Sequence, residues 1–246
     1  MEYFLLICAG IIVGVINTFA GAGASISLAL YTFMGVDLPV ANATNRVSVL
    51  AQTITMSGEF LRQGKLDYRV GLLLSIPTII GSVVGSLCVG MLSSKLFAVV
   101  LCGILFFMLL VLIFNPTKAL RTKSNHTAPR WYHYTLLLFI GFYGGAFHIG
   151  IGYLFLWLFI MGLGYDYIEA NALKGFVVLP YTIFSLGVFA FTEEVLWVYG
   201  LVHGVGNIIG TYFAARYSQY FPIKILRVGL IIFIIFTLFY IIHTKL

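Results

Sequence analysis

Two long stretches of the chain contain no Asp, Glu, Lys or Arg. They cover residues 3–36 and 131–165. As one continuous helix, each would be roughly 50 Å long, which exceeds the ~30 Å hydrocarbon core of a bilayer but is too short for two full crossings and a turn. Both contain glycine clusters near the middle, within 21–24 and 144–152. Each stretch is therefore predicted to form a broken, re-entrant hairpin of two shortened helices.

Three further apolar segments follow each hairpin, and their lengths suit ordinary membrane-spanning helices. In the first half they cover 42–61, 70–92 and 96–114, and in the second half 171–192, 196–215 and 223–243. The apolar runs are continuous rather than alternating, which favours helices over a membrane β-barrel. The pattern predicts an all-α polytopic membrane protein.

The two halves of the chain repeat one another at a constant offset along the sequence. The matching positions include glycines, aspartates and an Ala-Asn-Ala string, namely Gly35 with Gly164, Asp37 with Asp166, and Asn42 with Asn171. After a four-residue gap, Gly81 and Gly85 align with Gly206 and Gly210. We predict a first transmembrane repeat over residues 1–114, a cytoplasmic linker over 115–130 and a second transmembrane repeat over 131–246.

Composition and charge support a membrane location and give an orientation. The chain is 61% hydrophobic and 9% charged, whereas soluble domains carry roughly 25% charged residues. Its net charge of +6 is explained by basic cytoplasmic loops rather than by nucleic-acid binding. If the loop at 62–69 is cytoplasmic, ten basic residues lie inside, and Lys95 and Lys245 lie outside. Both termini are then extracytoplasmic and the second repeat is inverted, as in many secondary transporters.

Motifs in both halves resemble those of a known family. The first half has Gly21-Ala-Gly-Ala-Ser25 followed by Gly35-Val-Asp-Leu-Pro-Val-Ala-Asn-Ala-Thr44. The second has Gly144-Gly-Ala-Phe-His-Ile-Gly-Ile-Gly152 followed by Glu169-Ala-Asn-Ala-Leu-Lys174. This pattern resembles the sulfite exporter TauE/SafE family, also called toluene sulfonate uptake permeases, over essentially the whole chain. The resemblance implies a bacterial inner-membrane permease or exporter of small sulfur-containing anions such as sulfite, sulfonates or sulfoacetate.

Two basic side chains lie inside predicted spans. Arg46 and Lys174 occupy adjacent positions of the two repeats, one to two turns into the helix after each hairpin. Insertion scales assign such a charge a cost of about 2.5–3.5 kcal/mol at a helix centre, so it needs a partner or a function. We predict that both converge on an anion near the midplane, helped by helix N-termini. The alternative is that both snorkel to lipid phosphates.

Small and polar residues around the hairpins complete the predicted substrate site. Asn42, Asn45 and Asn171 would donate hydrogen bonds to a sulfonyl oxygen, although helix capping is the commoner role for Asn42 and Asn171. His148 is either a packing residue or a pathway group that titrates near neutral pH. Gln52 lies six residues after Arg46 and is predicted to face elsewhere. The other predicted site residues are Asn17, Thr18, Gly21, Gly23, Ser25, Gly150 and Gly152.

Other functional classes fit the sequence less well. An intramembrane protease would need a Gly-x-Ser-Gly element or a His-Glu-x-x-His motif, and the chain has neither. We therefore predict no enzyme activity, no cofactor and no metal site. The alternatives are a channel or a transporter of another small anion, a cation or a metal, and a non-transporting assembly subunit. The expected partners are a sulfur-containing anion and the lipid bilayer, with a proton or a sodium ion as candidate coupling ion, and no nucleic acid.

Overall fold

The computed structural model describes residues 1–19, 21–114, 125–217 and 223–245. The first half of the chain forms α1 (Glu2–Phe19), α2 (Ala24–Phe33), α3 (Leu38–Arg62), α4 (Tyr68–Gly90) and α5 (Ser94–Phe114). The second half forms α6 (Trp131–Ala146), α7 (Ile151–Trp157), the π-helical η2 (Leu158–Gly162), α8 (Tyr167–Thr192), α9 (Trp197–Arg216) and α10 (Ile223–Lys245). The predicted all-α fold is confirmed, with each charge-free stretch broken into two shorter helical parts.

Glycines with positive φ mark the breaks at matching places in the two halves. Gly21 and Gly150, which the repeat offset aligns with each other, have φ values of 66° and 67° and lie between the two helices of each hairpin. Gly35 and Gly164 have φ values of 86° and 75° and follow each hairpin. Side chains other than glycine rarely adopt this conformation. The spacing supports the predicted internal repeat, while the inverted orientation stays a prediction.

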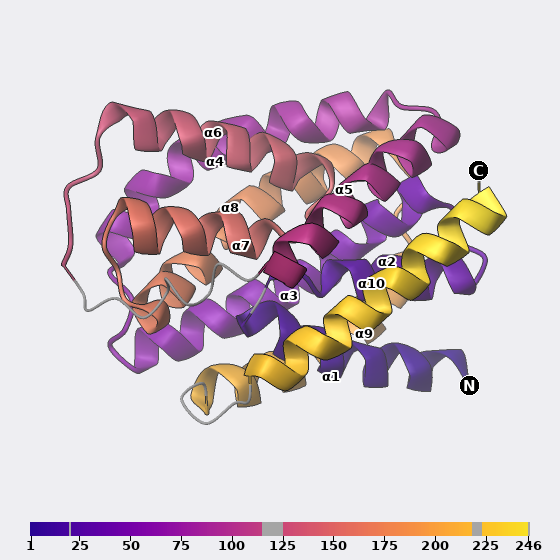
Figure 1. Cartoon of the computed structure of the whole chain (residues 1–246), viewed down its shortest axis with the longest axis horizontal. Coiled ribbons are helices and arrows are strands. Elements are labelled where there is room, and N and C mark those ends of the chain that lie inside the picture. Colours follow the sequence, from indigo (N-terminus) through magenta and orange to yellow (C-terminus); the bar gives the residue numbers. More distant parts are fainter. Residues whose placement is uncertain (20, 115–124, 218–222, 246) are drawn as a thin grey trace.

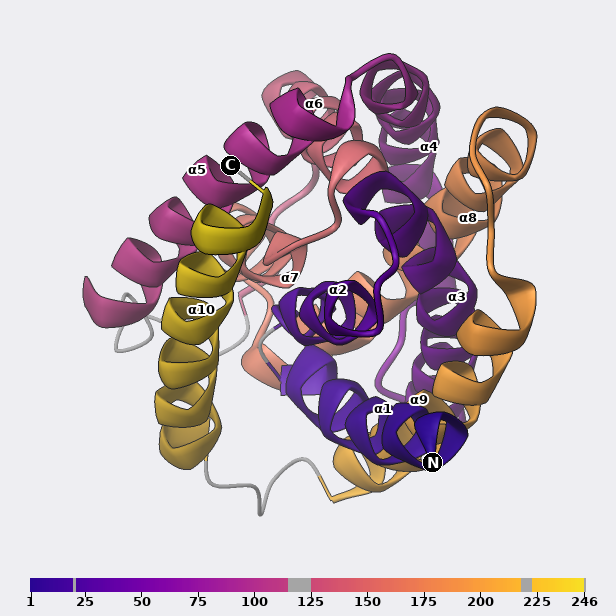
Figure 2. The same cartoon turned by 90° about the vertical axis from the view of Figure 1, so that its right-hand side faces the viewer.

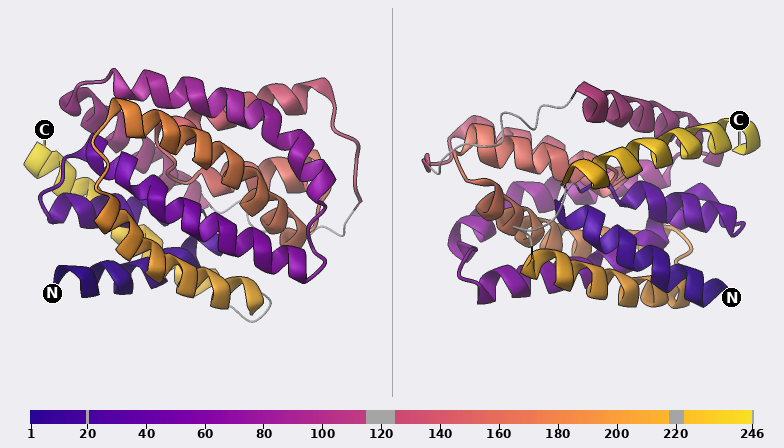
Figure 3. Two further views of the ribbon diagram at one scale, coloured as in Figure 1. Left: turned by 180° about the vertical axis from the view of Figure 1, so that it is seen from behind. Right: turned by 60° about the horizontal axis from the view of Figure 1, so that its bottom comes forward.

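The long helices also pack in matching pairs. Helix α1 packs against α9 as α6 packs against α4, and α3 packs against α9 as α8 packs against α4. Helices α3 and α8 contact each other, and so do α5 and α10. Figure 3 shows α3, α4, α8 and α9 side by side on one face, while α5 and α10 lie together on the other side. Exchange of the two halves leaves this set of contacts unchanged.

Glycine pairs allow the closest of these contacts. A Cβ atom added at Gly81 or Gly85 of α4 would overlap a carbonyl oxygen of α6, and one added at Gly141 or Gly145 of α6 would overlap a carbonyl oxygen of α4. The same reciprocal contact joins α1 and α9 through a second set of four glycines, Gly10, Gly14, Gly206 and Gly210. Small residues spaced four apart let membrane helices approach closely. The predicted equivalence of 81–85 with 206–210 therefore has a matching structural role.

The short helices lie inside the bundle. Viewed along the long axis, α2 and α7 are surrounded by the longer helices (Figure 2). The N- and C-termini lie at the same end of the molecule (Figure 1), as the prediction for the chain ends requires. Many large apolar side chains point outward on the long helices, among them Ile76, Phe106, Phe139, Ile183 and Leu201. Soluble monomers rarely expose such continuous apolar surface.

Three helices of the described chain, α1, α4 and α8, are long and apolar enough to cross a membrane. Helix α3 has 25 residues but is less apolar. It can contain polar residues because most of its side chains face protein rather than the outside. Asn42, Asn45 and Arg46 are all buried in it. The structure is that of a polytopic membrane protein whose most polar helix is central.

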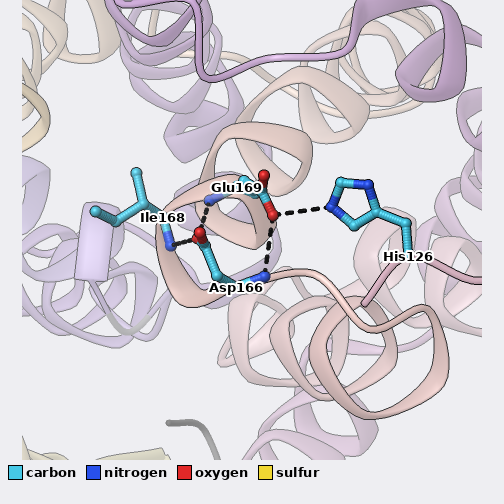
Figure 4. A network of polar contacts seen from close by, with 4 residues as sticks. All are labelled: His126, Asp166, Ile168 and Glu169. Atoms are coloured by element: carbon cyan, nitrogen blue, oxygen red, sulfur yellow. Dashed lines mark hydrogen bonds and ion pairs between the residues drawn. The ribbon is translucent and has the colours of Figure 1, made fainter. Parts of the chain in front are cut away.

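A capping box fixes the start of α8 (Figure 4). The Asp166 Oδ1 atom accepts hydrogen bonds from the backbone N–H groups of Ile168 and Glu169 at 2.8 and 2.9 Å. Glu169 Oε2 accepts from the backbone N–H of Asp166 at 3.1 Å and pairs with His126 Nε2 at 3.0 Å. These contacts satisfy N–H groups that have no partner inside the helix. They also attach His126, which lies within the predicted linker, to the start of α8.

Candidate functional site

The two helix breaks meet in the interior. A Cβ atom added at Gly21, in the first break, would overlap the Cα atom of Gly152, which follows the second break. The two backbones therefore approach each other as closely as van der Waals contact allows, and Gly21 also has positive φ. Glycine at these positions is required by geometry. The contact supports the prediction that both hairpins reach a common central point.

A small cavity of about 20 Å³ lies beside this contact. Its polar side chains are Asn17 of α1, Gln52 and Thr53 of α3, His148 of the second break and Lys174 of α8. Gly21 and Gly152 line it as well. A cavity of this size holds about one water molecule. A small anion therefore fits only after the surrounding helices move apart.

Lys174 brings a buried positive charge to the cavity. Its side chain is 3% exposed, and its Nζ atom donates to the carbonyl oxygens of Asn17 and Thr18 at 3.1 and 2.9 Å and to Asn171 Oδ1 at 2.6 Å. These three bonds use all three N–H groups of the ammonium. All the acceptors are neutral, and no carboxylate pairs with Lys174 in the described ranges. The partial negative charge at the end of α1 stabilises the cation only in part.

Arg46 binds the opposite break. It is 0% exposed, and its two terminal nitrogens donate to the carbonyl oxygens of Gly144 and Gly145 at 2.7 and 2.8 Å, in the last turn of α6. The guanidinium carbon lies 5.3 Å from the centre of the Phe189 ring. Arg46 is not among the cavity-lining residues. In this structure only Lys174 lines the cavity, so the convergence of Arg46 on the same anion stays a prediction, while burial of both side chains excludes snorkelling.

The predicted asparagines have other roles than capping. Asp37 and Asp166 hold the N-cap positions of α3 and α8, so Asn42 and Asn171 lie within the helices and the capping alternative is wrong. Asn42 Nδ2 donates to the carbonyl of Ala146 at 2.8 Å, and Asn171 Nδ2 donates to the carbonyl of Tyr167 at 3.0 Å. Asn45 is buried, and its Oδ1 accepts from Ser48 Oγ at 3.3 Å. None of the three lines the cavity.

Gln52 is the main residue that the sequence interpretation missed. Asn17 Oδ1 accepts from the backbone N–H of Gly23 at 2.6 Å, and Asn17 Nδ2 donates to Gln52 Oε1 at 2.9 Å. Gln52 lies on the same face of α3 as Asn45, seven residues earlier, because two helical turns span about seven residues. The position of Gln52 was judged by its distance from Arg46, which faces another side of the helix. The sequence did contain a signal for this site, namely a polar amide side chain inside an apolar span, followed directly by the hydroxyl of Thr53.

The contact between Asn17 and Gln52 has a counterpart in the second half, which His148 makes with Tyr181. Its Nδ1 atom lies 2.7 Å from the Tyr181 hydroxyl, and the repeat offset aligns Tyr181 with Gln52 of the first half. His148 has a φ of 59°, an uncommon conformation for a residue with a side chain. Such strain persists where surrounding contacts hold it, and it is enriched at functional sites.

The other predicted residues lie near the cavity without lining it. Thr18 contributes its carbonyl to Lys174, while its hydroxyl donates to the carbonyl of Gly14 at 2.8 Å. The Ser25 hydroxyl donates to the carbonyl of Ala22 at 2.8 Å. A Cβ atom added at Gly150 would overlap the side chain of Met108, so Gly150 faces α5. Among the predicted residues, the structure brings Asn17, Gly21, His148, Gly152 and Lys174 to the cavity.

Comparison with known proteins decides the family. The family model described as "Sulfite exporter TauE/SafE" matches residues 6–241. The chain belongs to the sulfite exporter TauE/SafE family. This TauE/SafE protein is 26% identical over 227 residues to a "Probable membrane transporter protein ORF9" from Sinorhizobium sp., a match that covers 92% of this chain and 87% of the relative.

A second relative of this TauE/SafE protein is a "Probable membrane transporter protein" from Haemophilus influenzae (strain ATCC 51907 / DSM 11121 / KW20 / Rd). It is 23% identical over 212 residues, which cover 86% of this chain and 83% of the relative. No solved structure matches the chain at a significant level. The recognised family is confirmed, and the protein is a membrane transporter of that family.

Proposed function

We propose that this protein is a secondary transporter of small sulfur oxyanions or organosulfur anions, such as sulfite, sulfonates or sulfoacetate. The observation that carries the proposal is the Lys174 ammonium, which lies at a central cavity with neutral partners only. A buried charge is costly unless a countercharge accompanies it. A bound anion supplies that charge, whereas a site for a cation or metal would place carboxylates there.

The bonds of Lys174 suggest how binding is coupled to movement. Because all three N–H groups are used, an anion oxygen that binds the ammonium must displace Asn171 or one of the carbonyls of Asn17 and Thr18. Displacement of a carbonyl releases the end of α1 from α8. Opening of the break then enlarges the cavity. The same movement of one half relative to the other drives alternating access.

We propose the orientation given by the basic loops, with both termini outside the cytoplasm and the second half inverted. Single cysteines at four positions test it in a variant without the native cysteines. They replace Lys65 and Lys95 in the first half, Arg130 at the end of the linker, and Glu194 in the second half. A membrane-impermeant maleimide should label Lys95→Cys and Glu194→Cys in spheroplasts, and the other two only after permeabilisation. Labelling of Arg130→Cys from outside would refute the inversion.

The transport proposal is tested with purified protein in liposomes. Preloaded unlabelled sulfite or methanesulfonate should drive saturable uptake of the same labelled anion, and liposomes without protein should show none. Acetate and chloride are the comparison anions, and a channel would give non-saturable flux. If only cations, or no solute at all, exchanged across the membrane, the proposed function would be wrong.

A further inference from the structure

The hydrogen-bonding capacity around the cavity is uneven. The backbone N–H of Gly23 binds Asn17 Oδ1 and thereby fixes the orientation of that amide, so that Asn17 Nδ2 binds Gln52 Oε1. A side-chain amide has two acceptor lone pairs on its oxygen and two N–H donors on its nitrogen. Gln52 Nε2 donates to no group within the described residues, although Gln52 is 4% exposed and lines the cavity. Its two N–H groups are open to the cavity.

His148 presents a second donor. The Tyr181 hydroxyl has no acceptor other than His148 Nδ1 among the described groups, and we therefore assign its proton to that bond. A neutral imidazole that accepts at Nδ1 carries its hydrogen at Nε2. His148 Nε2 makes no bond in the ranges that the structure covers, and His148 is 5% exposed and lines the cavity. Protonation of the ring would leave Nε2 a donor.

Most acceptors near the cavity already bind one donor. Lys174 occupies the carbonyls of Asn17 and Thr18 and the Oδ1 atom of Asn171. Asn17 occupies Gln52 Oε1. The Thr53 hydroxyl gives its proton to the carbonyl of Val49 at 2.9 Å, so it offers the cavity only a lone pair. The polar hydrogens left without a partner at the cavity are the N–H groups of Gln52 and His148, and they lie beside one positive charge.

We infer that Gln52 Nε2 and His148 Nε2 are specificity-determining donors, which with Lys174 select an anionic group bearing three unprotonated oxygens, such as a sulfonate head group or the sulfite dianion. This inference rests on the proposed function and names the ligand chemistry of the same site. The donors come from three separate elements, α3, the second break and α8. A pyramidal group has one oxygen for each of the three donors, while a carboxylate has two oxygens and must share one of them between two donors.

The inference predicts rejection of an isosteric anion that carries a proton. Near neutral pH a phosphonate keeps an O–H for part of the time, since phosphoryl groups have a second pKa of about 6. That O–H would meet an N–H donor at one of the three positions, and a site whose buried polar groups are left mispaired discriminates strongly. Methanesulfonate should therefore bind at least about 10-fold more tightly than methylphosphonate at pH 6, where the monoanion is abundant.

Gln52→Glu tests the donor role directly. The carboxylate keeps an acceptor for Asn17 Nδ2, but presents an oxygen instead of an N–H group to the cavity. The ratio of methanesulfonate to methylphosphonate affinity, measured by calorimetry at pH 6, should fall at least about 10-fold, because the new acceptor suits the phosphonate O–H and repels the sulfonate. Gln63→Glu makes the same change at the residue that follows α3, outside the cavity, and should leave the ratio unchanged.

His148→Asn provides the second arm, because asparagine tolerates the positive φ at this position. It should weaken methanesulfonate binding with little change in melting temperature. An unaltered affinity ratio in Gln52→Glu, together with wild-type sulfonate affinity in His148→Asn, would overturn the donor assignment while leaving transport itself intact. Absence of sulfonate binding and transport by the wild-type protein would instead overturn the proposed function.

Discussion

Lys174→Gln is expected to abolish most saturable sulfonate transport while leaving the protein folded. Removing one member of a buried charge pair typically costs about 3–5 kcal/mol, so kcat/KM should fall by roughly 10² to 4 × 10³. The glutamine can still donate to the carbonyls at the end of α1, so the melting temperature should change little. Initial rates of counterflow in liposomes, together with thermal melting in detergent, measure both effects.

Two comparisons make this result specific to the site. Lys95→Gln removes an exposed positive charge and should leave transport unchanged. Arg46→Gln removes a charge that holds α6 without lining the cavity, so it should lower the melting temperature more than it changes KM. Full activity in a variant with both Arg46→Gln and Lys174→Gln would refute the site.

Gly85→Ala should destabilise the protein strongly, because its Cβ atom would overlap the carbonyl oxygen of Phe142. Backbone cannot move aside as a flexible side chain can, so α4 and α6 must separate, at a cost of about 3 kcal/mol. Thermal melting of the purified protein should show a large fall in the transition temperature. Transport should fall too, because α6 ends at the break that Arg46 holds.

Gly58→Ala and Gly103→Ala are the matched controls. Both glycines lie inside helices, α3 and α5, and an added Cβ atom would meet no atom within 4 Å. Alanine favours helix by up to about 1 kcal/mol over glycine, so these variants should be as stable as the wild type or slightly more stable. Similar melting in all three variants would contradict the close glycine packing between α4 and α6.

The sequence predicted the elements well because hydropathy and helix breakers act locally. The charge-free stretches were too long for one span and contained glycines, so the breaks at Gly21 and Gly150 could be anticipated. The constant offset between matching motifs gave the equivalence of the halves. Membrane helices follow such rules closely because lipid leaves few alternatives for the backbone.

The partners of the polar side chains could not be predicted in the same way. Spacing along a helix gives the face on which a residue lies, but not the element that packs against that face. Adjacent residues differ by about 100° around the helix axis, so Asn45 and Arg46 face different neighbours. Gln52 was missed because Arg46 served as its reference. Lys174, which the repeat offset aligns with Asn45, lines the cavity.

Each half of the chain supplies a basic side chain that binds the break of the other half, and this arrangement has a consequence for biogenesis. The carbonyl group of Thr18 leaves the ribosome 156 residues before the lysine that binds it, and Arg46 precedes the carbonyl of Gly144 by 98 residues. Neither interrupted hairpin can mature in the bilayer until the opposite half has been translated and inserted. An N-terminal fragment released early would expose unsatisfied main-chain groups to lipid, which makes it a natural target for membrane quality-control proteases.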